Sequence, residues 1–579
     1  MLLRLSILLP LLLLVGCADV LHRPDVAPDS PAAVEKKPVV LPYQPSPVVL
    51  DGGLTEELVY ATLAAEVAVQ RGDLHAAYLH YLETARASGD AYGAEQAVRI
   101  SIYLKDLKGA IAAVEEWVRL SPNHLPGRTL AVMLYAQDKR QDLAFEQLQA
   151  VVKISEAQGE DGFMRAVAAV SQAENHGLGL VLIRRLVAEY GTDHRARYAL
   201  VLAAVGAGEY EEAEVEARRL LDSYPDRSKL QALLSSILHS RGDDKGAIQM
   251  LESALEESPE SRTLLTAYAR LLMEVDELGS AYEQFQRIER LAEGDGDVLY
   301  TLGILALELE HWGDGRNYLQ KAITSGKRVD EATYYIGYSY ELEGDIDEAL
   351  EWYGQVNNGE QRIEARIRSA TIMAREGDME GARELLRKLR QLMPHRAVDI
   401  YMAEGAILRG REMHEQEMAL YNQALQEFPD NAELLYARAL NAAVMGQIDM
   451  LEADLLEILM QNPSHADAMN ALGYTLADQT DRLQEALGYI QQALVLKPDA
   501  PAILDSMGWV QYRLGNYEES LRYLQRAMEL MPDAEIAAHL GEVLWVAGEE
   551  EEARRVWQEA LDRNPHSKPL QKTIERFGQ

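Results

Sequence analysis

The feature that most constrains the fold is a repeat of about 34 residues, which is clearest from residue 194 onward. Prolines recur 33 to 35 positions apart within two runs, and a glycine stands seventeen positions before many of them. The prolines are Pro225 and Pro259, then Pro394, Pro429, Pro463, Pro498, Pro532 and Pro565; the glycines are Gly208, Gly242, Gly377, Gly446, Gly515 and Gly548. Proline has no amide hydrogen to continue a helix, and glycine easily takes the positive φ of a tight turn. Each unit is therefore predicted to be two helices joined by a turn.

Unit Pro501–Asp533 illustrates the role of each position. Gly508 would let the second helix approach the first, and Gly515 would open the turn between them. Ser520 is small where the two helices are expected to cross, and Pro532 ends the unit. A single unit cannot bury its apolar face alone, so neighbouring units are expected to stack into a solenoid.

Counting at this period gives about fifteen units between residue 58 and residue 566. The match is strong over residues 194–566, weaker over 54–193, and weakest over 160–193, where no proline closes the unit. Residues 567–579 are interpreted as a capping helix. The predicted unit starts are Leu58, Ala91, Leu125, Glu160, His194, Ser228, Arg262, Gly296, Asp330, Ile363, Val398, Ala432, Ala466, Pro501 and Ala534.

The period and residue pattern resemble the tetratricopeptide repeat family. That resemblance implies an all-α fold, a superhelical solenoid of helix–turn–helix units whose first helices line the concave side. No segment of the chain has the alternating pattern of a strand-rich domain.

The first residues carry the pattern of a secretory signal, with one arginine and then an apolar run from Leu5 to Val15. The chain has a single cysteine, Cys17, and the stretch Leu14-Val15-Gly16-Cys17 resembles the lipobox of bacterial lipoproteins. The resemblance implies removal of residues 1–16 and acylation of Cys17, so that lipid alone would anchor the protein. An ordinary signal peptide with an incidental cysteine is the alternative.

Residues 17–53 are expected to be a linker, because they contain seven prolines and no helical period. An aspartate directly after the cysteine would resemble the inner-membrane retention signal of such lipoproteins. Ala18 stands there instead, so the resemblance implies sorting to the outer membrane, facing the periplasm. Asp19 leaves inner-membrane retention open.

Composition argues against several functions. The formal net charge is −37, so the chain would repel nucleic-acid phosphates. The thirteen histidines are scattered, and no nucleophile elbow, phosphate loop, dinucleotide fingerprint or zinc-protease motif occurs. We therefore predict no catalytic residues, no metal and no cofactor, and assign function to a surface.

A second stripe of side chains recurs on the first helices, about 100° around from the packing stripe. In helix 501–513 it consists of Asp505, Trp509 and Tyr512. Large aromatics are typical of protein-binding faces. Packing against the neighbouring first helix is the alternative for each residue. The predicted partner-binding residues are Tyr334, Tyr338, Tyr436, Tyr474, Asp505, Trp509, Tyr512 and Trp545, whereas Trp117 and Trp557 are assigned to the core.

A closer resemblance lies in the C-terminal third, in NALGYTLADQTDRLQEAL (470–487) and the segment 502–545, taken with the lipobox and the proline-rich spacer. Together these resemble long tetratricopeptide outer-membrane lipoproteins of proteobacteria. One such lipoprotein is the adaptor of a periplasmic carboxyl-terminal processing protease, and it helps deliver peptidoglycan hydrolases for degradation. The resemblance implies a non-enzymatic scaffold with those partners. An assembly or secretion lipoprotein of an outer-membrane or exopolysaccharide export machine is the alternative, and a cell-wall enzyme is a third possibility.

Overall fold

The computed structural model describes residues 56–171, 176–191, 193–221, 223–224 and 226–577. The predicted signal segment, Cys17 and the proline-rich linker lie outside the described residues, as does Pro225. Regular structure in the described part is helical throughout, without a strand. The all-α prediction is therefore confirmed.

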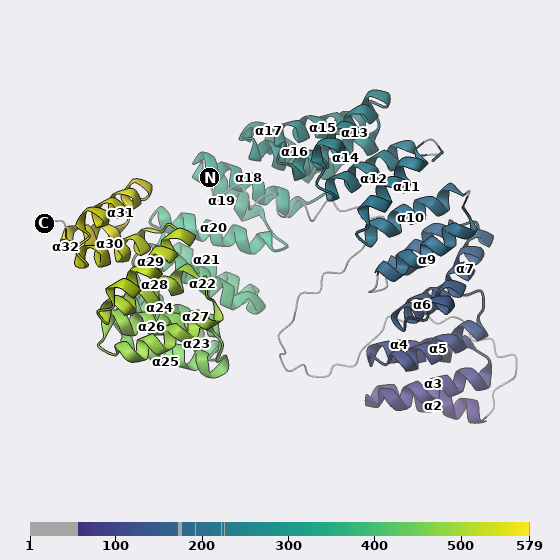
Figure 1. The fold of residues 1–579 in the computed structure, drawn as a ribbon, viewed down its shortest axis with the longest axis horizontal. Helices are drawn as coiled ribbons and strands as arrows, with labels where there is room; N and C mark the ends of the chain where they lie inside the picture. Colours follow the sequence, from purple (N-terminus) through teal and green to yellow (C-terminus); the bar gives the residue numbers. More distant parts are fainter. Residues whose placement is uncertain (1–55, 172–175, 192, 222, 225, 578–579) are drawn as a thin grey trace. The chain divides into compact units, whose positions relative to one another are not determined.

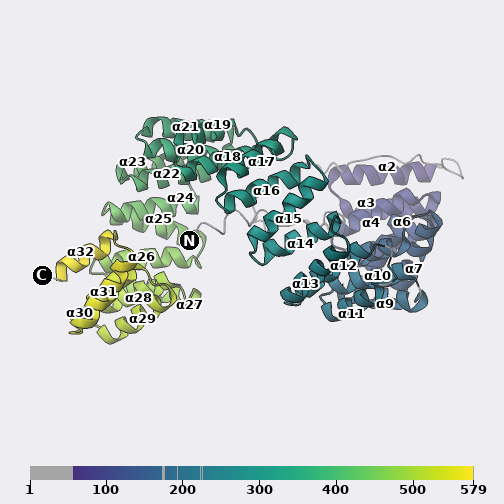
Figure 2. The same cartoon turned by 90° about the horizontal axis from the view of Figure 1, so that it is seen from above.

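The chain divides into two compact units, Met1–Ala332 and Thr333–Gln579 (Figures 1 and 2). Helix α18 (Val329–Glu343) runs across the division. The helices before it are α2 (Glu56–Arg71), α3 (Leu74–Ser88), α4 (Ala91–Tyr103), α5 (Leu107–Leu120), α6 (Leu125–Gln137), α7 (Gln141–Ala157), α8 (Gly162–Ser171), α9 (His176–Glu189), α10 (His194–Gly206), α11 (Tyr210–Leu220), α12 (Arg227–Ser240), α13 (Asp244–Glu257), α14 (Arg262–Glu274), α15 (Leu278–Leu291), α16 (Gly296–Glu308) and α17 (Trp312–Thr324).

The second compact unit continues the same pairing of helices and ends on one further helix. Its elements after α18 are α19 (Ile346–Gln355), α20 (Gln361–Arg375), α21 (Met379–Leu392), the short 3-10 helix η1 (Pro394–Arg396), α22 (Ala397–Gly410), α23 (His414–Glu427), α24 (Ala432–Val444), α25 (Ile448–Gln461), α26 (Ala466–Gln479), α27 (Leu483–Leu496), α28 (Pro501–Arg513), α29 (Tyr517–Leu530), α30 (Ala534–Val546), α31 (Glu550–Arg563) and α32 (Lys568–Phe577).

The even-numbered helices from α2 to α30 are the first helices of the units. Each begins within two residues of the unit start predicted from the repeat; α8, for example, begins at Gly162 against a predicted Glu160. Even the divergent unit 160–193 therefore keeps the phase of the array. Helix α32 occupies the stretch interpreted as a capping helix.

Glycine and aspartate together shape the turn inside a unit. Gly242 has a φ of 82°, in the left-handed region that glycine adopts at little cost. The next residue, Asp243, caps α13, because its side chain accepts a hydrogen bond of 2.9 Å from the amide of Gly246. All six glycines that the repeat pattern picked out have positive φ.

In the unit formed by α28 and α29, the two helices meet at a position where a residue larger than glycine would clash. A Cβ on Gly508 of α28 would lie 2.5 Å from Cγ of Leu524 on α29. The Ser520 hydroxyl donates a hydrogen bond of 2.7 Å to the Gly508 carbonyl and is fully buried. The roles predicted for Gly508 and Ser520 are thus the ones the structure assigns.

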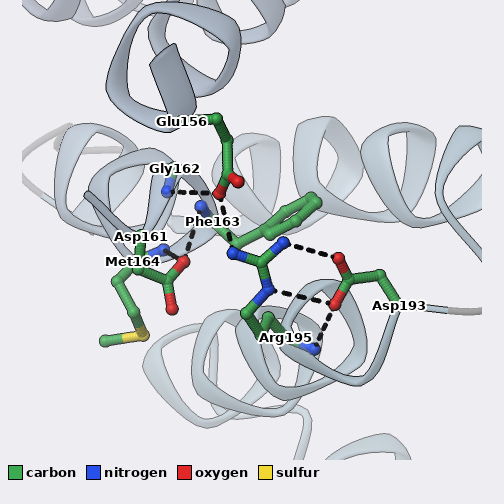
Figure 3. A network of polar contacts seen from close by, with 7 residues as sticks. All are labelled: Glu156, Asp161, Gly162, Phe163, Met164, Asp193 and Arg195. Carbon is green, nitrogen blue, oxygen red and sulfur yellow. Dashed lines mark hydrogen bonds and ion pairs between the residues drawn. The ribbon is translucent and has the colours of Figure 1, made fainter. Parts of the chain in front are cut away.

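The divergent unit 160–193, which has no closing proline, is held by a network of polar contacts (Figure 3). Arg195, in the first turn of α10, pairs with Asp193 at 2.8 Å and with Glu156 of α7 at 2.9 Å. Glu156 also accepts a hydrogen bond from the backbone amide of Gly162. Asp161 accepts hydrogen bonds from the amides of Phe163 and Met164, so both carboxylates hold the start of α8. The hydrogen bond from Arg195 lowers the pKa of Asp193. These charged groups connect α7, the second helix of its unit, to α10, which lies two units further along the chain.

Among the described helices, none is both long enough and apolar enough to cross a membrane.

Candidate protein-binding face

Helix α28 is buried over most of its length. Eight consecutive residues from Ile503 to Val510 are buried. The helix contacts α29 of its own unit, α27 and α26 of the unit before, and α30 of the unit after. The stripe predicted to face a partner therefore lies against neighbouring first helices over part of its length.

Asp505 pairs with a histidine one unit later in the chain. The Nδ1 atom of His539 lies 2.9 Å and 3.0 Å from the two carboxylate oxygens of Asp505. Both residues are buried, with 7% and 9% of their surface exposed. Burial lowers the pKa of His539, but the carboxylates of Asp505, Glu535 and Glu542 outweigh burial, so the net shift is upward. The pair joins α28 to α30.

Trp509 covers the same histidine from another side. Its ring stacks on the imidazole of His539 with the centroids 4.3 Å apart. Its indole Nε1–H donates a hydrogen bond of 3.2 Å to Asp478 of α26. Only 7% of Trp509 is exposed. This side chain therefore connects three consecutive first helices, α26, α28 and α30.

Tyr512 and Tyr474 lie beside this cluster and stay partly exposed. The Tyr512 hydroxyl donates a hydrogen bond of 3.1 Å to Glu542, which also pairs with Arg576 of α32. Burial, followed by the charge of Glu542, raises the pKa of Tyr512 to about 12. The ring of Tyr474 lies 6.1 Å from that of His539.

The surroundings of Tyr474 are acidic. Burial raises its pKa, and the charges of Asp478, Glu535 and Asp505 raise it further. Burial also raises the pKa of Glu535, against the opposing charge of His539. The partly exposed tyrosine therefore sits beside carboxylates from three consecutive first helices.

The remaining predicted residues lie in three other settings. Trp545 packs on Trp557 and Phe577, with ring centroids 5.7 Å and 6.3 Å away. The Arg554 guanidinium lies 4.6 Å from the ring centroid of Trp545. Tyr436 stacks on His465, with the ring centroids 6.2 Å apart. Both predicted residues are partly exposed.

Tyr334 and Tyr338 form a separate buried group around Arg368 of α20. Arg368 donates a hydrogen bond of 2.9 Å to the Tyr334 hydroxyl, and its guanidinium lies 4.6 Å from the Tyr338 ring centroid. The two tyrosines are 8% and 6% exposed. They hold α18 to α20.

The structure thus sorts the predicted residues by exposure. Asp505, Trp509, Tyr334 and Tyr338 are buried against the next first helix, which is the alternative stated for each residue of the stripe. The reason is geometric: adjacent first helices pack closely enough to cover this stripe. Tyr436, Tyr474, Tyr512 and Trp545 keep part of their surface, and partner binding by the stripe stays a prediction. The assignment of Trp117 and Trp557 to the core is confirmed.

Sequence reasoning missed the residues that complete this cluster. His539, Glu542 and Asp478 are its polar members. A usable signal was present for one of them, because His539 follows Asp505 by 34 residues, one repeat along the chain. A carboxylate and an imidazole at that spacing are brought together by the stacking of the units.

No arrangement suited to a bound metal is present in the described residues, where no three His, Cys, Asp or Glu side chains gather as a metal would require. A surface hollow with a volume of about 790 Å³ lies over α19, α20 and α21. Its lining includes Asp345, Arg366 and Met373 and none of the predicted binding residues.

Stacked helical pairs with a repeat of about 34 residues define a helical-repeat scaffold, and comparison with known proteins gives its family. Residues 198–262, 300–356 and 475–544 match the tetratricopeptide repeat family. A TPR repeat-containing protein of Pseudomonas aeruginosa is 32% identical over 542 residues, which cover 93% of this chain and 90% of that protein. The chain belongs to the tetratricopeptide repeat family.

Two solved structures are also similar. A thermophilic TPR protein of Thermus thermophilus is 22% identical with a TM-score of 0.28, covering 30% of this chain and 93% of its own. The APC/C hetero-tetramer Cut9–Hcn1 provides a chain that is 14% identical with a TM-score of 0.27, covering 90% of this chain and 97% of its own. The family assignment rests on the sequence matches. Tetratricopeptide repeats are typically non-catalytic scaffolds that bind other proteins.

Proposed function

We propose that this chain is a lipid-anchored scaffold that binds proteins in the periplasm. The observation that carries the proposal is the row of first helices with recurring aromatic side chains, in a family of protein-binding scaffolds. The lipobox-like stretch ending at Cys17 supports the anchor, and Ala18 supports the outer membrane. Acyl chains on Cys17 would hold the protein at the membrane, because each buried methylene contributes about 0.8 kcal/mol.

The binding surface we propose is the exposed part of the stripe on α26 and α28. Tyr474 and Tyr512 would supply aromatic contact area, while the buried pair of Asp505 and Trp509 would hold the helices that present them. Carboxylates from three first helices surround Tyr474, which favours a partner segment with lysine or arginine side chains.

The partners we propose are a carboxyl-terminal processing protease and the cell-wall hydrolases that it degrades. Support for this step comes from the resemblance of segments 470–487 and 502–545 to adaptor lipoproteins. A scaffold that holds both would raise the effective concentration of substrate at the protease.

Crosslinking the tagged lipoprotein in cells, followed by detergent extraction and mass spectrometry, tests this function. Recovery of a periplasmic serine protease together with wall hydrolases supports the adaptor. Recovery of only export-machine or pilus components contradicts it and favours an assembly lipoprotein. In a second experiment, the purified chain without residues 1–53 is incubated with peptidoglycan and with peptides. Turnover without an added protease would contradict the scaffold function.

A further inference from the structure

The first helices of the second compact unit form a continuous row. From α22 onward each first helix packs against the next one along the chain, and α32 adds a further member after α30. Among the described residues of this unit, the second helices make no comparable contact with one another. The array therefore curves with its first helices on the inner side.

This row comes back on itself through one ion pair. The ammonium of Lys568, the first residue of α32, donates a hydrogen bond to the carboxylate of Glu412, in the turn between α22 and α23. The two residues are 156 positions apart in the chain. The last helix of the row therefore meets the turn that directly follows α22.

Glu412 stands where the repeat favours glycine. It precedes Pro429 by seventeen positions, the spacing that Gly446 keeps from Pro463. Its φ is 57°, in the left-handed region that strains any residue with a side chain. Among the described residues of the second compact unit, Glu412 is the one non-glycine residue with a positive φ. The glutamate is thus held there against the backbone preference of the site.

Lys568 is also placed against its local preference. It lies at the N-terminus of α32, where the positive end of the helix dipole repels a cation. Carboxylates and side-chain oxygens are the groups that stabilise this end of a helix. Two residues that are each locally unfavourable, and that bond each other over this separation, indicate a contact with a role beyond local folding.

We propose that Lys568 and Glu412 form a reversible clasp that closes the row of first helices. The two side chains are 73% and 69% exposed, so their attraction is weak and is screened by salt. A contact of this strength can open and close again, whereas breaking a buried pair would strongly destabilise the fold. The clasp therefore allows the inner side of the row to widen and narrow without unfolding.

Helix α32 connects the clasp to the tyrosines of the stripe. Arg576, in the last turn of α32, pairs with Glu542 of α30, and Glu542 accepts a hydrogen bond from the Tyr512 hydroxyl. A movement of α32 that opens the clasp therefore reaches Tyr512 through two contacts. A partner segment bound at Tyr512 would enter and leave while the clasp is open, and this consequence alone rests on the proposed function.

Distance measurements between two spin labels test the clasp without any partner. The labels are attached at E415C and K572C in a full-length C17S background, because both native side chains are exposed and lie three and four residues from the clasp. We expect a short-distance population that K568E and E412K each lower by about two- to fivefold, since like charges then face each other. The double variant E412K with K568E should restore it. Single variants without effect would overturn the proposal, as would a double variant that restores nothing.

Salt tests whether the clasp is reversible. At about 1 M salt the Debye length is about 3 Å, so the short-distance population of the labelled chain should fall, and it should recover after dialysis to low salt. A population that high salt leaves unchanged would overturn the proposal, and so would a loss that dialysis does not reverse.

Two further variants separate the clasp from the strained turn. Glu310, in the turn between α16 and α17, is exposed and has a φ of 60°, so E310K is the matched control and should leave the label distances unchanged. E412G relaxes the backbone and removes the carboxylate. We expect it to lose the short-distance population while its thermal midpoint stays at or above that of the unsubstituted chain. A short-distance population that survives in E412G would overturn the proposal, as would an equal loss in E310K.

Discussion

His539 and Asp505 form a buried ion pair across the boundary between the last two repeat units, with Nδ1 2.9 Å from the nearer carboxylate oxygen. The indole of Trp509 stacks on the same imidazole. The docking of the last unit is therefore tied to the protonation of one side chain.

The pair of His539 and Asp505 predicts that the free energy of unfolding falls as pH rises. The pKa of His539 is raised in the folded chain, against about 6.5 when unfolded. The stabilisation is thus complete below about pH 6.5 and is lost as pH rises through the folded value. Urea unfolding followed between about pH 6 and about pH 9 should show this loss in the native chain. The D505N variant should show a smaller slope; an equal slope would contradict the linkage.

We predict that the main role of Trp509 is to stabilise the folded chain. Replacing it by alanine removes a buried ring and should lower the free energy of unfolding by about 3–5 kcal/mol. The W509F variant keeps an aromatic ring over His539 and loses the hydrogen bond to Asp478, so its cost should be nearer 1 kcal/mol. Urea midpoints measured by circular dichroism compare the two. Similar small costs for both would mean that the ring is not packed as described.

Two glycines of the C-terminal array should respond in opposite directions to alanine. G508A forces a methyl group against Leu524 and should destabilise the protein by about 1–3 kcal/mol. At Gly488, inside α27, a Cβ meets no atom within 4 Å. G488A should therefore stabilise the protein by up to about 1 kcal/mol, since alanine favours helix. Thermal unfolding of both variants checks the contrast, and a stabilising G508A would refute the close approach.

Partner capture should depend on Tyr474 and Tyr512, the partly exposed tyrosines of the stripe on α26 and α28. Replacing Tyr474 and Tyr512 together by serine is expected to weaken capture by tenfold or more, about 1.4 kcal/mol. Retention of the crosslinked partners on immobilised protein measures it, with circular dichroism to verify helicity. The control is Y103S, because Tyr103 is 66% exposed and belongs to the first compact unit. Equal capture by both variants would remove the stripe from the binding surface.

The repeat made the fold predictable because its key residues act locally. Gly515 has the positive φ and Ser520 the helix crossing that the pattern assigned to them. The exposure of Trp509 was not predictable in the same way. Whether that ring meets solvent depends on how closely α28 and α30 pack, and on the presence of His539 one repeat later. Residue spacing within one helix carries no information about either.

The contact from Asp505 to His539 also bears on how such an array can grow. Repeat proteins are commonly pictured as lengthening by duplication of a whole unit. If residues 501–533 were copied in tandem, the first Asp505 would face the position of Ser506 in the copy, where the present chain offers His539. One buried carboxylate would then be left without its cation, at a cost of about 3–5 kcal/mol. The last two units are therefore a matched set, and a duplication of residues 501–533 alone would need a second change to restore the buried pair.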